Sequence, residues 1–143
     1  MLIPDVNVYI YAHRPESSRH EEFRDWLSEA AVGEETLGVG ESILASFVRI
    51  VTNHRIYLDP TPPAAALDAC EAILGGSSAT GVRPGARHWQ IFSGLCRTLR
   101  ARANTVPDVY LAALALENGA TFITTDQGFG RFPGLRFRHP LDG

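Results

Sequence analysis

The chain has 143 residues, a length that fits one domain able to bury its core without disulfides or bound metal. Cys70 and Cys96 form no Cys-x-x-Cys pair and have no histidine at metal-binding spacing, so we interpret both as small core residues. The longest apolar stretch, 109–116, is too short to span a bilayer, and Asp5 interrupts the N-terminal apolar run, which argues against a signal peptide. We therefore expect a cytoplasmic protein.

The net charge of −3 argues neither for nor against a polyanionic partner, but the charge is unevenly distributed. Residues 1–82 contain 5 Arg and 12 Asp or Glu, whereas residues 83–143 contain 8 Arg and 4 acids. All 13 basic residues are arginine, which a genome favouring Arg codons would explain. The basic second half is also compatible with phosphate contacts, because the guanidinium group can bind a phosphate at two points.

In chain order, segments with the pattern of short strands alternate with segments of helical periodicity. Strands are predicted at the N-terminus up to Pro4, at 36–39, around Val82, at 121–125 and at 135–137. Helices are predicted at about 18–33, 41–54, 63–75, 86–102 and 105–119. This alternation predicts an α/β fold with a parallel sheet covered on both faces. With no repeat and no linker, residues 1–143 should form a single domain.

Two of the predicted strands end at a carboxylate. The first strand runs into Asp5, and the strand beginning at Thr121 runs into Asp126, which a turn-forming Gly128 follows. In open parallel sheets the carboxyl ends of the strands lie along one edge, and ligands bind in the crevice outside that edge. We therefore expect both carboxylates to face one crevice.

Two further acids occupy the first turns of helices. Glu41 opens a helix directly after a strand, and Asp108 follows Pro107 at the start of an apolar helix that we expect to be central and buried. Taken singly, such acids are ordinary, because they interact favourably with the helix dipole, and Thr105-x-x-Asp108 resembles a capping box. The start of a helix after a strand lies at the same sheet edge, however, so all four acids can face the crevice.

Several carboxylates in a small space repel one another. Two charges ~4 Å apart at an effective dielectric of ~20 cost about 4 kcal/mol. Such a cluster needs either shared protons or a cation, and oxygen ligands without convergent His or Cys favour Mg²⁺ or Mn²⁺ over Zn²⁺. An acidic pocket can then bind an anionic substrate through the metal.

These residues also form a recognisable order along the chain. It comprises Asp5-x-Asn7 after an N-terminal strand, Glu41 opening a helix, Pro107-Asp108-x-x-Leu111-Ala112-Ala113-Leu114-Ala115, and Thr124-Thr125-Asp126-x-Gly128-Phe129. The pattern closely resembles the PIN-domain ribonucleases. The small size and the ending 132–137 resemble the VapC-type toxins of bacterial toxin–antitoxin pairs.

The resemblance implies a three-layer α/β/α fold and metal-dependent endonuclease activity on RNA, with Mg²⁺ or Mn²⁺ as the cofactor. It implies a catalytic and metal-binding quartet of Asp5, Glu41, Asp108 and Asp126. Residues that would support this quartet are Asn7, Asn104 and Thr125. It further implies a small cognate antitoxin and a homodimeric toxin.

Arginines of the second half are candidates for RNA contacts. The best placed are Arg97 and Arg100, on the predicted outer face of the 86–102 helix. Contacts from arginine to phosphate add affinity without sequence information. A simple solvated helix face is the alternative interpretation.

Two other functions remain open from the sequence. The opening Ile3-x-Asp5-Val6-Asn7-Val8 resembles the Asp-x-Asp-x-Val motif of haloacid-dehalogenase-like phosphatases, although Asn7 replaces the second Asp and the chain has no lysine. A non-catalytic module that binds RNA or a protein is the third possibility. Loss of metal-dependent RNA cleavage on changing Asp5 would distinguish the nuclease from both.

An antitoxin could inhibit such a site by inserting a basic side chain, for which we expect Arg, among the carboxylates. It would also need an apolar groove. Aromatic residues near the predicted site could supply one or could belong to the core: Tyr9, Tyr11, Trp26 and Phe47.

Overall fold

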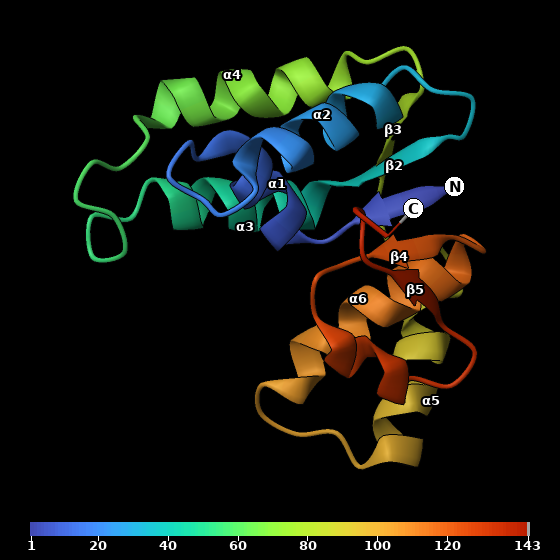
Figure 1. The fold of residues 1–143 in the computed structure, drawn as a ribbon. Helices are drawn as coiled ribbons and strands as arrows, with labels where there is room; N and C mark the ends of the chain where they lie inside the picture. The colour runs from blue at the N-terminus through green and yellow to red at the C-terminus, as the bar shows by residue number, and fades with distance from the viewer. Residues whose placement is uncertain (143) are drawn as a thin grey trace.

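The computed structural model describes residues 1–142 and shows an alternating α/β architecture (Figure 1). The strands are β1 (Leu2–Pro4), β2 (Leu37–Gly40), β3 (Ala79–Val82), β4 (Thr121–Ile123) and β5 (Arg136–Arg138). The helices are α1 (Val6–His13), α2 (His20–Ala30), α3 (Glu41–Val51), α4 (Pro63–Leu74), α5 (His88–Leu99) and α6 (Thr105–Glu117), with a short 3₁₀ helix η1 (Gln127–Arg131).

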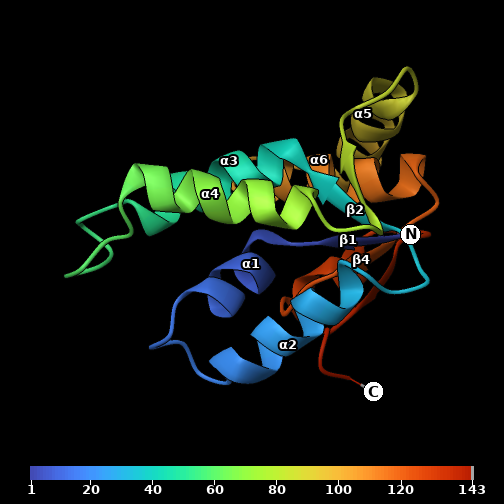
Figure 2. The same ribbon diagram turned by 90° about the horizontal axis from the view of Figure 1, so that it is seen from above.

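The five strands form one sheet in the order β3-β2-β1-β4-β5, and all four neighbouring pairs are parallel. Helices α1 and α2 lie on one face of the sheet and α5 and α6 on the other, whereas α3 and α4 extend past the carboxyl ends of the strands (Figures 1 and 2). The predicted three-layer α/β/α fold with a central parallel sheet is therefore confirmed.

The central strand β1 determines where the chain's first carboxylate lies. All three of its residues are buried, as expected for a strand covered by helices on both faces. Asp5 follows, with extended backbone angles, and its side chain accepts a hydrogen bond from the Val6 amide and so caps α1. The apolar run 8–12 therefore continues as a helix, and the change from strand to helix occurs at Asp5.

Helix α6 is the buried helix that the sequence predicts. Val109, Ala112, Ala113, Leu114 and Ala115 are each fully inaccessible to solvent. Small alanine side chains allow the helix to lie close to the sheet. Gly40 at the end of β2 lies against this packing, since a Cβ there would come within 3.5 Å of Leu114 and within 2.9 Å of Ile43.

Several boundaries differ from those expected. Helix α2 begins at His20, after Arg19 with its left-handed backbone (φ 58°), rather than at about residue 18. Helix α5 ends at Leu99, and Arg100 forms its left-handed C-cap (φ 51°). Arg100 therefore lies past the helix end, and only Arg97 of the predicted pair is on the helix face. Across residues 1–142, no helix is both long and apolar enough to cross a membrane.

Candidate active site

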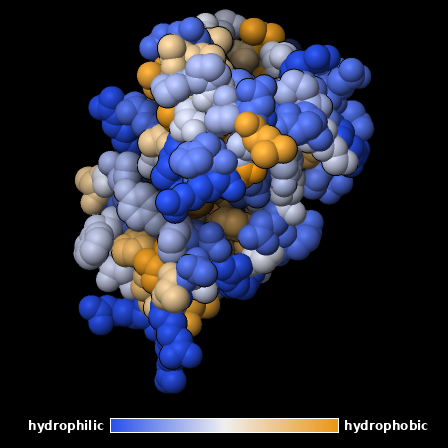
Figure 3. Space-filling view, turned by 90° about the vertical axis from the view of Figure 1, so that its left-hand side faces the viewer, coloured by the Kyte–Doolittle hydropathy of each residue, from blue (hydrophilic) through white to orange (hydrophobic). Residues whose placement is uncertain are grey.

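The carboxyl ends of the strands face the left-hand side of Figure 1, which Figure 3 shows face-on. Asp5 lies at this edge, directly after the central strand, and is only 6% exposed. Its backbone amide donates to the carbonyl of Ile123 at 2.7 Å, which ties the end of β1 to the end of β4. The carboxylate is thus held in place by the sheet itself.

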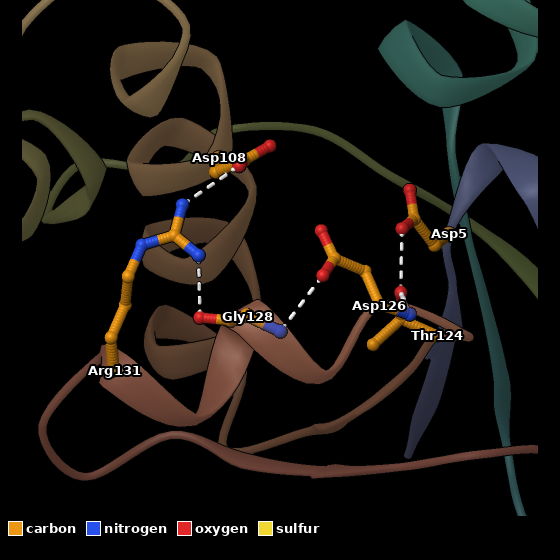
Figure 4. Close-up of polar contacts among 6 residues, drawn as sticks. All are labelled: Asp5, Asp108, Thr124, Asp126, Gly128 and Arg131. Carbon is orange, nitrogen blue, oxygen red and sulfur yellow. Dashed lines mark hydrogen bonds and ion pairs between the residues drawn. The ribbon is translucent and has the colours of Figure 1, made fainter.

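Both oxygens of the Asp5 carboxylate accept hydrogen bonds. Oδ1 accepts from the Val6 amide at 2.7 Å. Oδ2 accepts from the Thr124 hydroxyl at 2.7 Å (Figure 4). Because Pro4 pairs with Ile123 in the parallel register, the residues that follow each strand, Asp5 and Thr124, lie side by side. These two contacts orient the carboxylate and leave its remaining lone pairs available.

Thr124 also joins Asp5 to Asp126. Its hydroxyl oxygen accepts a hydrogen bond from the Asp126 amide at 3.1 Å, and the Asp126 side chain accepts from the Gly128 amide at 2.8 Å to cap η1. Sequence reasoning selected Thr125 for this supporting role and missed Thr124. The sequence holds no signal that distinguishes the two threonines, because Phe122 and Ile123 before them are both buried, and the β1–β4 register decides which one reaches Asp5.

Asp108 lies in the first turn of α6, as predicted, and is paired with an arginine that the sequence did not single out. Arg131 Nη2 donates to Asp108 Oδ2 at 2.9 Å, and Nη1 donates to the carbonyl of Gly128 (Figure 4). The Arg131 guanidinium also lies 4.5 Å from the ring centroid of Phe132. Arg131 therefore connects α6 to η1 and neutralises Asp108.

Glu41 opens α3 and is likewise paired. Its Oε2 accepts from Arg83 Nε at 2.9 Å, and the two side chains are 44% and 76% exposed. The parallel register aligns Gly40 with Val82, so the residues after these two strands, Glu41 and Arg83, are adjacent. Exposed ion pairs of this kind contribute only about 0–1 kcal/mol, so another cation can displace the arginine at little cost.

The pKa of Asp5 is raised above its ordinary value of 3.8. Burial is the largest cause, since it disfavours the charged form, and hydrogen bonds from Thr124 and Val6 oppose it. The negative charges of Asp108 and Asp126 raise the pKa further. Asp5 therefore interacts electrostatically with Asp108 and Asp126, whereas Glu41, the fourth predicted acid, is not among the charges that raise its pKa.

Within residues 1–142, no three acidic, histidine or cysteine side chains lie close enough together to hold a metal ion. The donor chemistry nonetheless fits Mg²⁺ or Mn²⁺, because the cluster supplies carboxylate oxygens around a buried charge that lacks a cationic partner of its own. In this arrangement Arg131 supplies the positive charge beside Asp108, and Arg83 supplies it beside Glu41.

The other predicted supporting residues lie at the same edge without a defined role. Asn7 is in the first turn of α1 and is half-buried. Asn104 is exposed at the N-cap of α6, and its side chain makes no capping hydrogen bond. Thr125 is half-buried after β4. The structure therefore gives the connecting role to Thr124 alone.

The buried charge of Asp5 predicts a pH-dependent stability difference. Replacing Asp5→Asn keeps an N-cap acceptor for Val6 and removes the charge that burial disfavours, so Tm in EDTA at pH 7 should rise by about 2–5 °C. Because the pKa of Asp5 is raised in the folded state, the charged carboxylate destabilises the fold fully above that pKa. This destabilisation disappears as pH falls towards 3.8. Thermal melts across pH should show the gain shrinking in acid, whereas Asp68→Asn on the exposed face of α4 should show no such trend. A loss of Tm that is equal at all pH values would mean that hydrogen bonding outweighs burial at this site.

The comparison with known families matches residues 2–135 to the PIN domain. Relatives span the whole length of the chain. VapC43 of Mycobacterium tuberculosis is a ribonuclease 47% identical over 143 residues, which cover 100% of this chain and 97% of the relative. The ribonuclease VapC37 of the same species is 36% identical over 140 residues, covering 98% and 97% of the two chains.

Solved structures share the fold at lower identity. VapBC-1 from nontypeable Haemophilus influenzae has a TM-score of 0.69 at 15% identity, covering 97% of each chain. VapC20 of M. tuberculosis, a sarcin-ricin-loop-cleaving toxin, has a TM-score of 0.65 at 14% identity, covering 95% of this chain and 99% of the other. The domain match and the full-length identity to several ribonucleases show that the chain belongs to the PIN domain family and, within it, to the VapC ribonucleases.

Proposed function

We propose that this VapC ribonuclease is a Mg²⁺- or Mn²⁺-dependent endoribonuclease and the toxin of a toxin–antitoxin pair, with residues 1–143 forming a single PIN domain. The observation that carries the proposal is the buried Asp5 carboxylate, fixed at the end of the central strand and close enough to Asp108 and Asp126 for their charges to raise its pKa. A cluster of carboxylates around one buried acid, at the ligand-binding edge of a parallel sheet, attracts a divalent cation.

The four acids would have different roles. Asp5, oriented by Thr124 and Val6, is the fixed ligand, and Asp126 is held near it through the same hydroxyl. Asp108 and Glu41 are exposed enough to adjust, and their arginine partners would have to yield when a cation enters. When bound, the metal supplies positive charge that stabilises the negative charge developing on the phosphate oxygens.

Release of Arg131 from Asp108 would also place a free guanidinium at the mouth of the acidic cluster. Such a group can bind a phosphate of the substrate through two hydrogen bonds. When the metal replaces Arg131 at Asp108, the acids would hold the metal and Arg131 would contact the RNA phosphate. The site would then carry positive charge beside the RNA backbone. The haloacid-dehalogenase-like and non-catalytic alternatives are not favoured by membership of the VapC ribonucleases.

Cleavage of RNA should depend on both metal and carboxylates. Single-stranded RNA incubated with Mg²⁺ or Mn²⁺ should be cut, and EDTA should abolish the activity. Asp5→Asn and Asp108→Asn should each lower kcat/KM by about 100-fold or more, equivalent to about 2.7 kcal/mol of transition-state stabilisation. Addition of Mg²⁺ should raise the Tm of the wild type and leave that of Asp5→Asn unchanged.

Asp68→Asn is the matched control for this experiment, because Asp68 is exposed on α4, away from the strand ends. It should retain wild-type activity and the Mg²⁺-dependent rise in Tm. Full cleavage in EDTA, or undiminished cleavage by Asp5→Asn, would contradict the proposed metal site.

We also propose that Arg97 and Arg100 contact the RNA backbone. Both are exposed, Arg97 in the last turn of α5 and Arg100 at the start of the connection that leads to α6 and Asp108. This connection brings arginine close in sequence to the acidic cluster. An RNA backbone bound along the segment between α5 and α6 would reach the carboxyl ends of the strands.

The double variant Arg97→Gln with Arg100→Gln should weaken RNA binding and lower the slope of log Kd against log salt by about 1.4, since each contact to a single strand contributes about 0.7. Fluorescence anisotropy with labelled RNA over a salt series measures this slope. Arg24→Gln with Arg49→Gln removes the same charge from exposed sites on α2 and α3. An equal change in both double variants would show a general charge effect rather than contacts by Arg97 and Arg100.

An antitoxin is the third part of the proposal, together with a cytoplasmic, homodimeric toxin. Of the aromatic residues considered for its groove, Tyr9 and Phe47 are 1% exposed and belong to the core. Tyr11 and Trp26 are half-buried. The fully exposed Leu58 and the half-exposed Leu67, before and on α4, are the better candidates for an apolar contact.

Co-expression of the neighbouring small reading frame should yield a stable complex with strongly reduced RNA cleavage. The physical basis is a basic side chain of the partner pairing with the acidic cluster, as Arg131 and Arg83 already do within the chain. Size-exclusion chromatography followed by a cleavage assay tests this. If no small protein binds, or if the complex cleaves RNA as fast as the free chain, the toxin role fails and an unregulated RNA-processing nuclease is the better account.

A further inference from the structure

A largely apolar cavity of about 330 Å³ adjoins the acidic cluster. It lies between the start of α3 and the start of α6, and Asp5 is one of its lining residues. Other lining residues are Ile43 and Ser46 on α3, Phe92 on α5, and Tyr110 and Leu111 on α6. In Figure 3 hydrophobic surface lies in and beside a recess at the middle of the face where the strands end, with hydrophilic side chains around it.

The aromatic wall of this cavity is held by contacts from behind. Phe92 and Tyr110 meet edge-to-face with centroids 5.7 Å apart, and His88 stacks on Phe92 at 6.2 Å. His88 is buried, and its Nε2 lies 2.9 Å from the Tyr110 carbonyl oxygen, so this hydrogen bond ties α5 to α6. The rings are therefore positioned before any ligand binds, which lowers the entropic cost of binding.

We propose that this cavity, the base pocket, binds the nucleobase of a nucleotide next to the phosphodiester that is cleaved. The inference rests on the proposed function, since it places that phosphodiester at Asp5. A nucleobase attached to a phosphate at Asp5 has to lie within one nucleotide of it, and the base pocket is the cavity that shares Asp5 with the acidic cluster.

The chemistry of the walls matches a nucleobase. Aromatic rings and aliphatic side chains can contact the faces of a base, and Phe92, Tyr110 and Leu111 supply such groups here. The hydroxyl of Ser46 can donate to or accept from the polar edge of a base. An aliphatic side chain of a partner protein would use only the apolar part of this lining.

Volume also agrees, because pockets of about 300–1,000 Å³ hold small organic ligands. The base pocket is at the lower end of this range and suits one base rather than a stack of several. Its walls come from α3, α5 and α6, so residues outside the acidic cluster would determine which RNA sequence is cut.

The test uses the full chain with Mg²⁺ and two kinds of small probe, one with a nucleobase and one without. Each of the four nucleoside 5′-monophosphates and, as the base-free probe, ribose 5-phosphate are titrated while ¹H–¹⁵N NMR spectra are recorded. We expect at least one nucleotide to shift the resonances of Ser46, Phe92 and Leu111 and to bind at least about tenfold more tightly than ribose 5-phosphate, as for one base–aromatic contact. Equal binding of both probes, or shifts confined to the acidic residues, would overturn the base pocket.

Ser46→Phe places a ring in the cavity, and Ala45→Phe adds the same ring at an exposed position of α3. Ser46→Phe should weaken nucleotide binding and raise KM for RNA by about tenfold or more with a smaller change in kcat, and it should alter the preferred cleavage sequence. Ala45→Phe should do neither. Ser46→Leu, a smaller filling group, provides the measurement if the larger variant unfolds.

The outcomes separate this inference from the proposed function. Metal-dependent cleavage with unchanged KM and sequence preference in a folded Ser46 variant would overturn the base pocket and leave the nuclease mechanism intact. Cleavage that persists in EDTA would overturn the metal mechanism, whereas nucleotide binding by the cavity would still be measured by NMR. If the resonances of the lining residues shift with protein concentration and no nucleotide binds, the cavity is a contact between two copies of the chain. That result would overturn the proposal.

Discussion

The buried charge of Asp5 is the constraint on which the candidate active site depends. The residue follows the central strand of a five-stranded parallel sheet, where helices on both faces keep water away. Its carboxylate is oriented by hydrogen bonds from Val6 and Thr124, yet burial still raises its pKa. A buried anion that is hydrogen-bonded but not neutralised destabilises the folded state, and a bound divalent cation would offset this destabilisation.

The acids around Asp5 differ from it in exposure and in partners. Asp108 and Glu41 are paired with Arg131 and Arg83 in half-exposed or exposed ion pairs, whose contribution to stability is small. The site therefore combines one rigid carboxylate with others whose partners can exchange. This division suits a site that must accept a metal and an RNA phosphate while the fold stays stable without them.

Apolar packing contributes to the same edge of the sheet. The alanine-rich face of α6 lets the helix lie close to the strands, and its first turn carries both Asp108 and the start of the apolar cavity. The contacts of His88 with Phe92 and with the Tyr110 backbone fix α5 against α6. The first turns of α6 would thus supply both an acid of the metal site, Asp108, and apolar surface for a base.

The order of the strands, five of the six α-helices, the parallel sheet and the edge at which Asp5, Glu41, Asp108 and Asp126 lie followed from the sequence, whereas helix α1 (Val6–His13) did not. Hydrophobic periodicity and the position of each acid after a strand or at a helix start are local properties, and parallel topology converts them into a shared location. The helix ends were less predictable, because Arg19 and Arg100 have the left-handed backbone that residue preference would assign to glycine or asparagine.

Partners across the sheet were decided only by the tertiary structure. The choice of Thr124 over Thr125 depends on the β1–β4 register, and the Glu41–Arg83 pair depends on the β2–β3 register. The Asp108–Arg131 pair joins a helix to a 3₁₀ turn 23 residues later. Sequence determined which chemical groups reach the edge of the sheet, whereas the register and the packing of α5 and α6 determined which of them touch, because such contacts join residues that are distant in the chain.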